Sequence, residues 1–274
     1  MVKNSAGSAR LGGGLANFGN ADIRESQILL NRASGGGGGL FNKDSMTITN
    51  AVIAANFADK GGGIFNDFQA GRRGGNNDAG YLSCTNCTIS GNNASDNGGG
   101  IDDRNQSELI LNNTIVANNI GDDLSDLSVI NEGSNNLIGT DPHFVRDASP
   151  VDAQGNGGDP GDVRLWCTST AIDAGTPDTT GLNIGDVDVL DLPRIVNEQI
   201  DIGAHEYFAG QLGELVLDGT RPIMELERAS HITAQVGLVA ESTLFQVEET
   251  AILESTFEVG DGKLFEVQIA SCIE

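Results

Sequence analysis

The stretch Gly61-Gly62-Gly63-Ile64-Phe65-Asn66 belongs to a series of four related stretches. The others are Gly12-Gly13-Gly14-Leu15-Ala16-Asn17, Gly37-Gly38-Gly39-Leu40-Phe41-Asn42 and Gly98-Gly99-Gly100-Ile101-Asp102-Asp103. The apolar residue after the glycines recurs at steps of 25, 24 and 37 residues, and the longest step contains an insertion at 69–80. A period in the twenties is typical of a solenoid, in which each repeat buries its apolar edge only against its neighbours.

A second series of apolar residues follows the same period. Its members lie 25, 36 and 26 residues apart, at Ile28, Ile53, Ile89 and Ile115. Five residues before them lie Ile23, Ile48, Cys84 and Ile110. These segments are too short and wrongly spaced for helices. Three short strands per repeat predict an all-β fold, a right-handed parallel β-helix, because parallel crossovers are right-handed. The four isoleucines are expected to form one buried column.

Asparagines occupy three further columns of the repeat. The columns are Asn31, Asn56, Asn92 and Asn118; Asn17, Asn42, Asn66 and Asp103; and Asn50, Asn86 and Asn112, with Glu25 out of step. Stacked asparagines can bond to the coils on either side, and asparagine tolerates the left-handed backbone of a tight bend. A structural role is therefore favoured over a row of ligands.

The composition narrows the class of protein. Glycine accounts for 38 of 274 residues, and aromatic residues for only 5%, which suits a solenoid better than a conventional core. The net charge of −24 disfavours nucleic acid as a partner and is compatible with bound cations. No run is long enough to span a membrane. No signal peptide precedes the repeats, so we expect that the natural N-terminus is missing.

The four cysteines fall into two groups. Cys84 and Cys87 lie in inward columns of the repeat and are expected to be buried, as small hydrophobes. A disulfide across the bend between them is the first alternative, and a zinc site is the second. Cys167 and Cys272 have no evident partners in the sequence.

A different pattern begins at residue 139. Its motifs are Asp141-Pro142-His143-Phe144, Ser169-Thr170-Ala171-Ile172-Asp173-Ala174-Gly175, Leu192-Pro193-Arg194 and Asp201-Ile202-Gly203-Ala204-His205-Glu206-Tyr207. These motifs resemble the choice-of-anchor Q region that closes many bacterial parallel β-helix proteins. The glycine and asparagine repeats resemble those of polymorphic outer-membrane adhesins. Together the resemblances cover about residues 10–208. They imply an extracytoplasmic β-helix protein and carry over no catalytic residues.

This sequence departs from the closing motif at three places. Thr170 replaces a proline, His205 replaces a tyrosine, and Leu190-Asp191 replaces the Asp-Gly usual before Pro-Arg. The expected organisation is β-helix coils over 1–138, the closing region over 139–208 and a linker over 209–222. Residues 223–274 are expected to form a small β-roll or solenoid module, since they resemble a C-terminal module of secreted bacterial proteins.

Two clusters are candidates for binding a ligand. Asp102 and Asp103 lie beside Arg104 on the fourth repeat, and paired carboxylates can serve hydrolysis or elimination. Phe41 and Phe65 follow inward residues, so alternation places them outward, where an aromatic pair could bind a sugar ring or a protein. Cover by a loop such as the insertion at 69–80 is the favoured alternative for the pair.

A third cluster is a candidate for calcium. Asp186, Asp188 and Asp191 place three carboxylates within six residues, and calcium takes oxygen ligands. A strand with a solvated acidic face is favoured over the calcium site.

The sequence as a whole predicts a non-catalytic secreted or cell-surface protein, adhesin-like or structural, with carbohydrate or a cell-surface protein as its partner. The alternative is a polysaccharide lyase or glycoside hydrolase on a β-helix scaffold.

Overall fold

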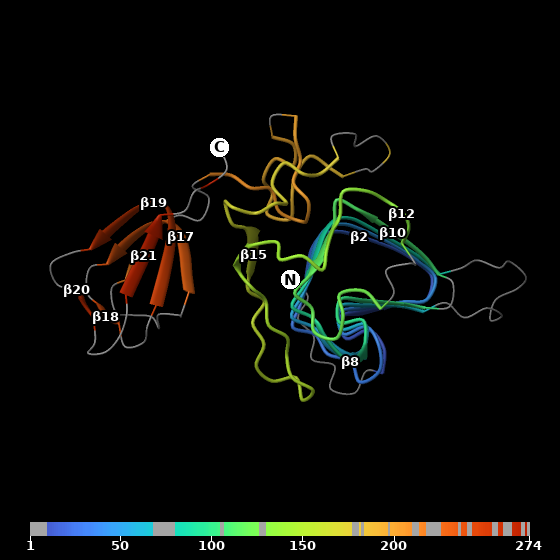
Figure 1. Cartoon of the computed structure of the whole chain (residues 1–274). Helices are drawn as coiled ribbons and strands as arrows, with labels where there is room; N and C mark the ends of the chain where they lie inside the picture. Colours follow the sequence, from blue (N-terminus) through green and yellow to red (C-terminus); the bar gives the residue numbers. More distant parts are fainter. Residues whose placement is uncertain are drawn as a thin grey trace, which may run out of the picture. The chain divides into compact units, whose positions relative to one another are not determined.

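The protein is built from β-strands, and most of them pair in parallel (Figure 1). The computed structural model describes residues 10–67, 80–104, 107–125, 130–176, 181, 184–196, 198–209, 214–217, 226–234, 237–239, 243–253, 257–259, 265–269 and 272. These ranges contain no helix. The chain divides into two compact units, of which the first comprises Met1–Arg164 with Thr170–Glu206 and the second Leu165–Ser169 with Tyr207–Glu274.

Within the described ranges, nothing helical has the length and apolar character needed to cross a membrane.

The glycine repeats form the first stack of strands in unit 1. It consists of β1 (Leu15–Asn17), β3 (Leu40–Asn42), β6 (Ile64–Asp67) and β9 (Ile101–Arg104), paired in parallel in that order. Leu15, Leu40, Ile64 and Ile101 are aligned across it, which confirms the predicted repeat. The preceding glycines allow the coils to approach closely. A Cβ on Gly39 would lie 2.7 Å from the carbonyl oxygen of Gly63.

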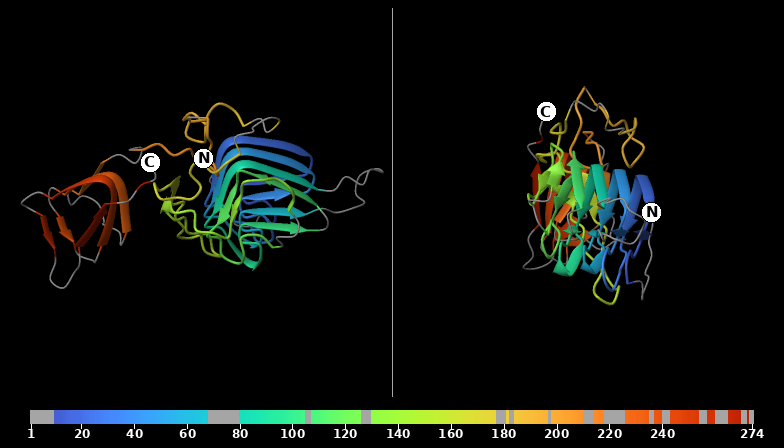
Figure 2. Two further views of the ribbon diagram at one scale, coloured as in Figure 1. Left: turned by 45° about the horizontal axis from the view of Figure 1, so that its top comes forward. Right: turned by 90° about the vertical axis from the view of Figure 1, so that its right-hand side faces the viewer.

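The segments that follow these strands along the chain form a second, longer stack. Its strands are β2 (Asn20–Leu29), β4 (Ser45–Ala54), β7 (Tyr81–Ser90), β10 (Glu108–Asn112), β11 (Ile115–Ala117), β12 (Ile130–Glu132) and β13 (Leu137–Ile138). Figure 2 shows the early strands side by side, from blue to green. The chain rejoins this stack at Tyr81, as predicted, whereas the predicted loop at 69–80 lies almost wholly outside the described residues.

Shorter pairings complete unit 1. β5 (Phe57–Lys60) pairs in parallel with β8 (Asn93–Asn97), and β14 (Phe144–Arg146) pairs with β15 (Asp162–Leu165). The core lies between the stacks and contains Leu40, Ile64 and Ile101 of the first stack together with Cys84 and Cys87 of the second, whereas Leu15 at the first repeat is exposed. Burial of both cysteines is therefore confirmed, and both are free thiols rather than a disulfide.

The fourth coil is displaced by one residue from the predicted register. Ile28, Ile53 and Ile89 are aligned as predicted, but their fourth partner is Val116, because Ile115 pairs with Thr88. The same shift aligns Leu111 instead of Ile110 with Cys84. It also replaces the predicted Asn112 by Asn113 at the bend, and Asn118 by Asn119 in the asparagine column.

Neighbouring residues of like chemistry explain this error. The pattern fits either register, because each of these positions has two adjacent residues of like chemistry: Ile110-Leu111, Asn112-Asn113, Ile115-Val116 and Asn118-Asn119. A slip of one residue nevertheless exchanges the two faces of a strand. The bend selects Asn113, whose φ of 46° matches those of Asn50 and Asn86. Ile115 is buried on the outer face, where a Cβ on Gly203 would lie 2.8 Å from its side chain.

Two columns of buried amides run across the coils. In the Asn17 ladder, Asn17 donates from Nδ2 to Oδ1 of Asn42, which donates to Asn66, at 2.8 Å each. In the Asn31 ladder, Asn31, Asn56, Asn92 and Asn119 are linked in the same way at 2.9–3.0 Å. These bonds satisfy amide groups that would otherwise be buried without partners, which is costly.

Both ladders have one direction and end on a carboxylate. Asn66 donates to Oδ1 of Asp103 at 2.6 Å, and Asn119 donates to Oδ1 of Asp123 at 2.7 Å. In every amide-to-amide bond of the two ladders the donor lies in the earlier repeat, and the last residue needs only to accept. Nδ2 of Asn56, Asn92 and Asn119 also donates back to the carbonyl oxygens of Ile28, Ile53 and Ile89. Burial raises the pKa of Asp103, and the beta-hydroxyl of Ser107 and the amide of Asn66, both bonded to its carboxylate, partly offset the rise.

The second unit has its own parallel sheet. It contains β16 (Glu214–Leu217), β17 (Leu226–Ala234), β19 (Thr243–Leu253) and β21 (Phe265–Ile269), and a separate pair joins β18 (Gly237–Val239) to β20 (Phe257–Val259). β16 falls in the predicted linker at 209–222, where alternating Leu215 and Leu217 align with β17.

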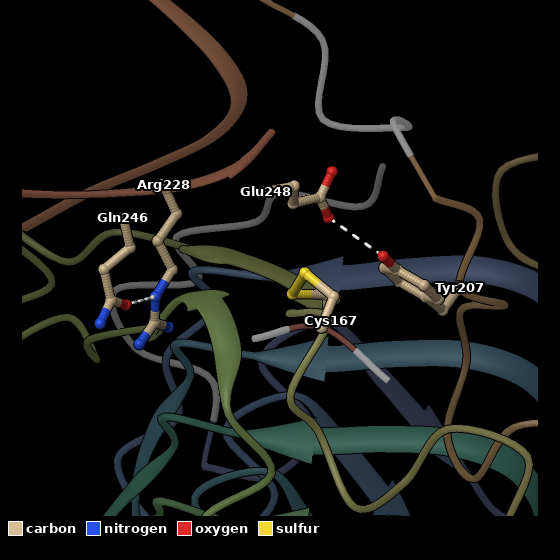
Figure 3. Close-up of a disulfide and its surroundings, with 6 residues drawn as sticks. Cys167, Tyr207, Arg228, Gln246 and Glu248 are labelled. Carbon is tan, nitrogen blue, oxygen red and sulfur yellow. Dashed lines mark hydrogen bonds between the residues drawn. A yellow bond between two sulfur atoms is a disulfide. The ribbon is translucent and has the colours of Figure 1, made fainter. Parts of the chain in front are cut away.

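A disulfide joins Cys167 to Cys272 in unit 2, although neither had an evident partner in the sequence (Figure 3). The bond spans 105 residues of chain. Near it, Tyr207 donates from its hydroxyl to Glu248, and Arg228 donates from Nε to Gln246.

The direction of the ladders makes a testable prediction. Asn42→Asp replaces the amide donor by an oxygen that faces Oδ1 of Asn66, so we expect a loss of at least about 3 kcal/mol in the free energy of unfolding. Asp103→Asn keeps the accepting oxygen and should cost about 1 kcal/mol at most. Urea unfolding of the two variants measures this difference. Equal losses would contradict the one-way ladder.

Candidate functional site

The described part of residues 139–208, which we call the closing segment, is organised around a turn held by Asp188. The Asp188 carboxylate is fully buried, and its Oδ1 accepts hydrogen bonds from the backbone amides of Leu190 and Leu192 at 2.7 and 3.0 Å. Its Oδ2 accepts from the amide of Glu206 at 3.0 Å. One side chain therefore shapes the turn that leads to Arg194 and ties it to the Asp201–Glu206 motif.

Arg194 lies at the centre of the closing segment with no exposed surface. Its Nη2 donates to the carbonyl oxygens of Asp201 and Gly203 at 2.9 and 2.6 Å. Its Nε lies 3.7 Å from Oε2 of Glu206. Burial lowers the pKa of Arg194, and the charges of Glu206, Asp201 and Asp188 oppose that change. A buried guanidinium is tolerated because the carboxylates of Asp201 and Asp188 compensate its charge and two backbone carbonyls accept its hydrogen bonds.

The Asp201–Glu206 motif is fastened to the strand stacks by its backbone. Gly203 donates its amide to the carbonyl of Asn113, and Ala204 donates to Oγ1 of Thr88, at 2.8 and 3.0 Å. Gly203 has a φ of 108°, a backbone conformation that favours glycine. The motifs of the closing region thus supply one buried polar cluster, consisting of Asp188, Arg194, Asp201, His205 and Glu206.

Two members of this cluster have strongly shifted pKa values. Burial raises the pKa of Glu206 to about 8, with a further rise from Asp201 and an opposing effect of Arg194. Burial also lowers the pKa of His205 to about 4, against the effects of Asp188 and Asp162. Both groups are therefore neutral at pH 7, which reduces the net charge buried with Arg194.

These shifts predict how stability depends on pH. The folded state holds a proton on Glu206 up to about pH 8, whereas the ordinary pKa is 4.5, so stability falls as pH rises through this window. His205 acts in the opposite direction, losing stability as pH falls from 6.5 to about 4. Urea unfolding between pH 6.5 and 8 isolates the glutamate. Glu206→Gln should flatten the fall in that window, and the exposed Glu198→Gln should leave it unchanged. A wild-type profile that rises over this window would contradict the assignment.

A pocket with a volume of about 200 Å³ opens beside the cluster, within unit 1. We call it the His205 pocket. Strands β2 and β4 contribute one wall and the closing segment the other, and the lining residues are Gln27, Leu29, Val52, Pro160, Gly161, Asp162, Val163, Arg164, Leu190 and His205.

An ion pair forms part of the polar lining. Arg164 donates from Nε to Oδ1 of Asp162 at 2.8 Å and from Nη2 to Oδ2 at 2.5 Å. Burial raises the pKa of Asp162, but the hydrogen bonds and charge of Arg164 outweigh it, and the net shift is downward. The pair is thus charged on both members and has no net charge. His205 is 5% exposed, and its Nδ1 has no hydrogen-bond partner among the described residues.

The predicted aromatic pair is buried. Phe41 and Phe65 are 1% and 7% exposed, and their ring centroids lie 5.7 Å apart. Phe18 packs on the far side of Phe41 at 5.5 Å, and the guanidinium of Arg104 lies 5.5 Å from the Phe65 ring. The ring faces that the alternation pattern left open for a ligand are therefore covered by Phe18, by Arg104 and by the two rings themselves.

The predicted acid pair is buried as well. Asp102 is 1% exposed, its Oδ1 accepts a hydrogen bond from Nε of Arg104 at 2.9 Å, and its Oδ2 lies 2.8 Å from Nη2 of Arg104 as an ion pair. Asp103 is 7% exposed and terminates the Asn17 ladder. The two acids serve separate structural contacts, and no shared substrate site is formed by them.

The candidate calcium ligands do not lie in one environment. Asp188 is buried and bonded to three backbone amides, whereas Asp186 and Asp191 are exposed. Among the described residues, no group of three or more His, Cys, Asp or Glu side chains is arranged to hold a metal ion. Calcium binding at these three residues stays a prediction of the sequence.

Comparison of the chain with family models, with curated proteins and with solved structures finds no match. Function is therefore inferred from the chemistry of this chain's own residues.

The sequence did not indicate the His205 pocket or the buried cluster. Asp201, Arg194 and Glu206 were recognised only as parts of a motif. Charged residues within a motif that otherwise contains Ile, Gly and Ala are a signal of buried ion pairing, because such charges need partners inside the protein.

Proposed function

We propose that unit 1 is a right-handed parallel β-helix and that the protein is a non-catalytic, adhesin-like or structural protein of the cell surface or the extracellular space. Three strands per coil, parallel pairing and steps of 24–37 residues support the fold. The general handedness of parallel crossovers supports the right-handed sense. The resemblance to outer-membrane adhesins and to the choice-of-anchor region supports the location.

The observation that supports a non-catalytic role is the set of contacts made by the two adjacent acids of the first stack, Asp102 and Asp103. Asp102 is bound by Arg104, and Asp103 is bound by Asn66 and Ser107. A hydrolase needs two carboxylates that face one bond of the substrate, and these two face different partners. These two acids thus serve the scaffold, which favours binding over catalysis as the function of this part of the surface.

The disulfide supports an extracytoplasmic location. Disulfides form and persist in oxidising compartments and are rare in the cytosol. Cys167 is fully buried, and its bond to Cys272 closes a long loop of unit 2.

Binding and turnover of polysaccharides test the proposed function together. The purified chain is passed over immobilised polysaccharides and cell-surface proteins, and the same polysaccharides are assayed for new reducing ends and for unsaturated sugars. Retention without either product supports an adhesin-like protein. Release of either product, abolished by Asp102→Asn or Asp103→Asn in a folded variant, would establish a carbohydrate-active enzyme instead.

The disulfide gives a separate prediction. In protein exported to an oxidising compartment, we expect alkylation to modify Cys84 and Cys87 only after unfolding, and Cys167 and Cys272 only after reduction. Loss of the bond in Cys272→Ser should lower the free energy of unfolding of unit 2 by up to about 5 kcal/mol, since the loop is long. Mass spectrometry and urea unfolding measure these effects. Four alkylated thiols without reductant would contradict the assignment.

A further inference from the structure

The His205 pocket has a buried polar atom with nothing to bond. Native proteins leave few buried polar atoms without a partner, and each exception needs an explanation. Nδ1 of His205 is such an atom among the described residues, and the ring lines the pocket. The imidazole is neutral at pH 7, so Nδ1 either donates or accepts, depending on the tautomer. Nδ1 itself has almost no accessible surface, so a ligand meets the exposed part of the ring and reaches Nδ1 only when the ring turns. A hydroxyl group then suits either tautomer, because it can donate and accept.

The other polar groups of the pocket suit the same chemistry. Asp162 offers carboxylate oxygens, Arg164 offers guanidinium donors, and Gln27 offers an amide that donates and accepts. Asp162 and Arg164 compensate each other's charge at 2.5–2.8 Å. A ligand with a net charge would meet no net charge of opposite sign here and would lose its hydration. The pocket therefore favours a neutral ligand with several hydroxyl groups.

The remaining lining is apolar and the space is small. Leu29, Val52, Val163 and Leu190 give one side of the ligand a surface without hydrogen-bonding groups. The volume of about 200 Å³ is below the roughly 300–1,000 Å³ of pockets for drug-sized molecules. A pyranose ring combines an apolar face with a rim of hydroxyls and fits this scale, whereas a chain of several sugars does not.

We propose that the His205 pocket binds one neutral sugar residue, either free or at the end of a glycan. This inference deepens the proposed surface-binding function and rests on it for its biological setting. The pocket lies between the outer side of β2 and β4 and the closing segment, away from the buried row of Phe41 and Phe65 that the sequence pattern indicated.

Ligand-observed NMR on the full chain tests the proposal. Neutral pyranoses (glucose, galactose, mannose and N-acetylglucosamine) are compared with galacturonic acid and glucosamine. We expect saturation transfer to at least one neutral sugar, with a Kd on the order of 1 mM. His205→Phe keeps the ring shape without Nδ1, and Gln27→Ala removes the amide. Each should weaken binding about tenfold. Gln154→Ala, an exposed glutamine outside the lining, should leave the Kd unchanged.

Three outcomes overturn the proposal: no transfer to any neutral sugar, preference for a charged sugar, or equal affinity in the wild type and Gln27→Ala. Gln27 is partly exposed, so its variant decides the question if His205→Phe does not fold. The proposed function is tested separately. If the protein binds a sugar but is not retained on any surface polymer, the surface role is contradicted and the His205 pocket stands as a sugar site. If retention is unchanged in both pocket variants, the surface role stands and the pocket has no part in it.

Discussion

The one-way hydrogen bonding of the two asparagine ladders is the constraint on which the first unit depends. Each buried amide donates to the amide aligned with it in the next repeat. A shift of one residue between two repeats would break this hydrogen bond. Removing a partner would leave a buried donor or acceptor unsatisfied. The carboxylates of Asp103 and Asp123 accept but cannot donate, so each ladder ends at an aspartate. Asp103 replaces the asparagine of its column, whereas Asp123 follows Asn119 by four residues.

The closing segment follows from the end of the ladders. Beyond Asp123 neither ladder continues within the described residues, and the last strands are short. The closing motifs instead bond to the side of the stack, through Gly203 to Asn113 and through Ala204 to Thr88. These two bonds position the neighbouring His205 beside β2 and β4. The pocket is thus a consequence of how the stack is closed.

The alignment of strands in the first three repeats was predictable from the sequence, because their columns contain few ambiguous neighbours. Leu15, Leu40 and Ile64 and the asparagines that follow them align as the pattern indicates. The fourth coil could not be predicted, because adjacent residues of like chemistry fit two registers, and only the left-handed bend at Asn113 and the bond to Asn119 distinguish them. Periodicity also carried no information on whether an outward residue is covered. Phe41, Phe65 and Asp102 therefore seemed available for a ligand and are buried by neighbours.

The candidate site was beyond prediction for a different reason. Its lining comes from residues 27–52, 160–164, 190 and 205, which no periodicity relates to one another. The Cys167–Cys272 bond likewise joins residues 105 positions apart without any shared motif. What the sequence did indicate was the closing motif, and the structure gives its charged residues a physical role as the partners of Arg194.

Hydrogen exchange of the side-chain amides tests the ladders most directly. In NMR spectra of the full chain, the Nδ2 protons of Asn31, Asn42, Asn56, Asn66 and Asn92 should exchange as slowly as the backbone amides of β4 and β7, because they are buried and bonded across the coils. Exchange of these protons at the rate of exposed asparagines, with the strand amides still protected, would show that the coils are not held by the ladders.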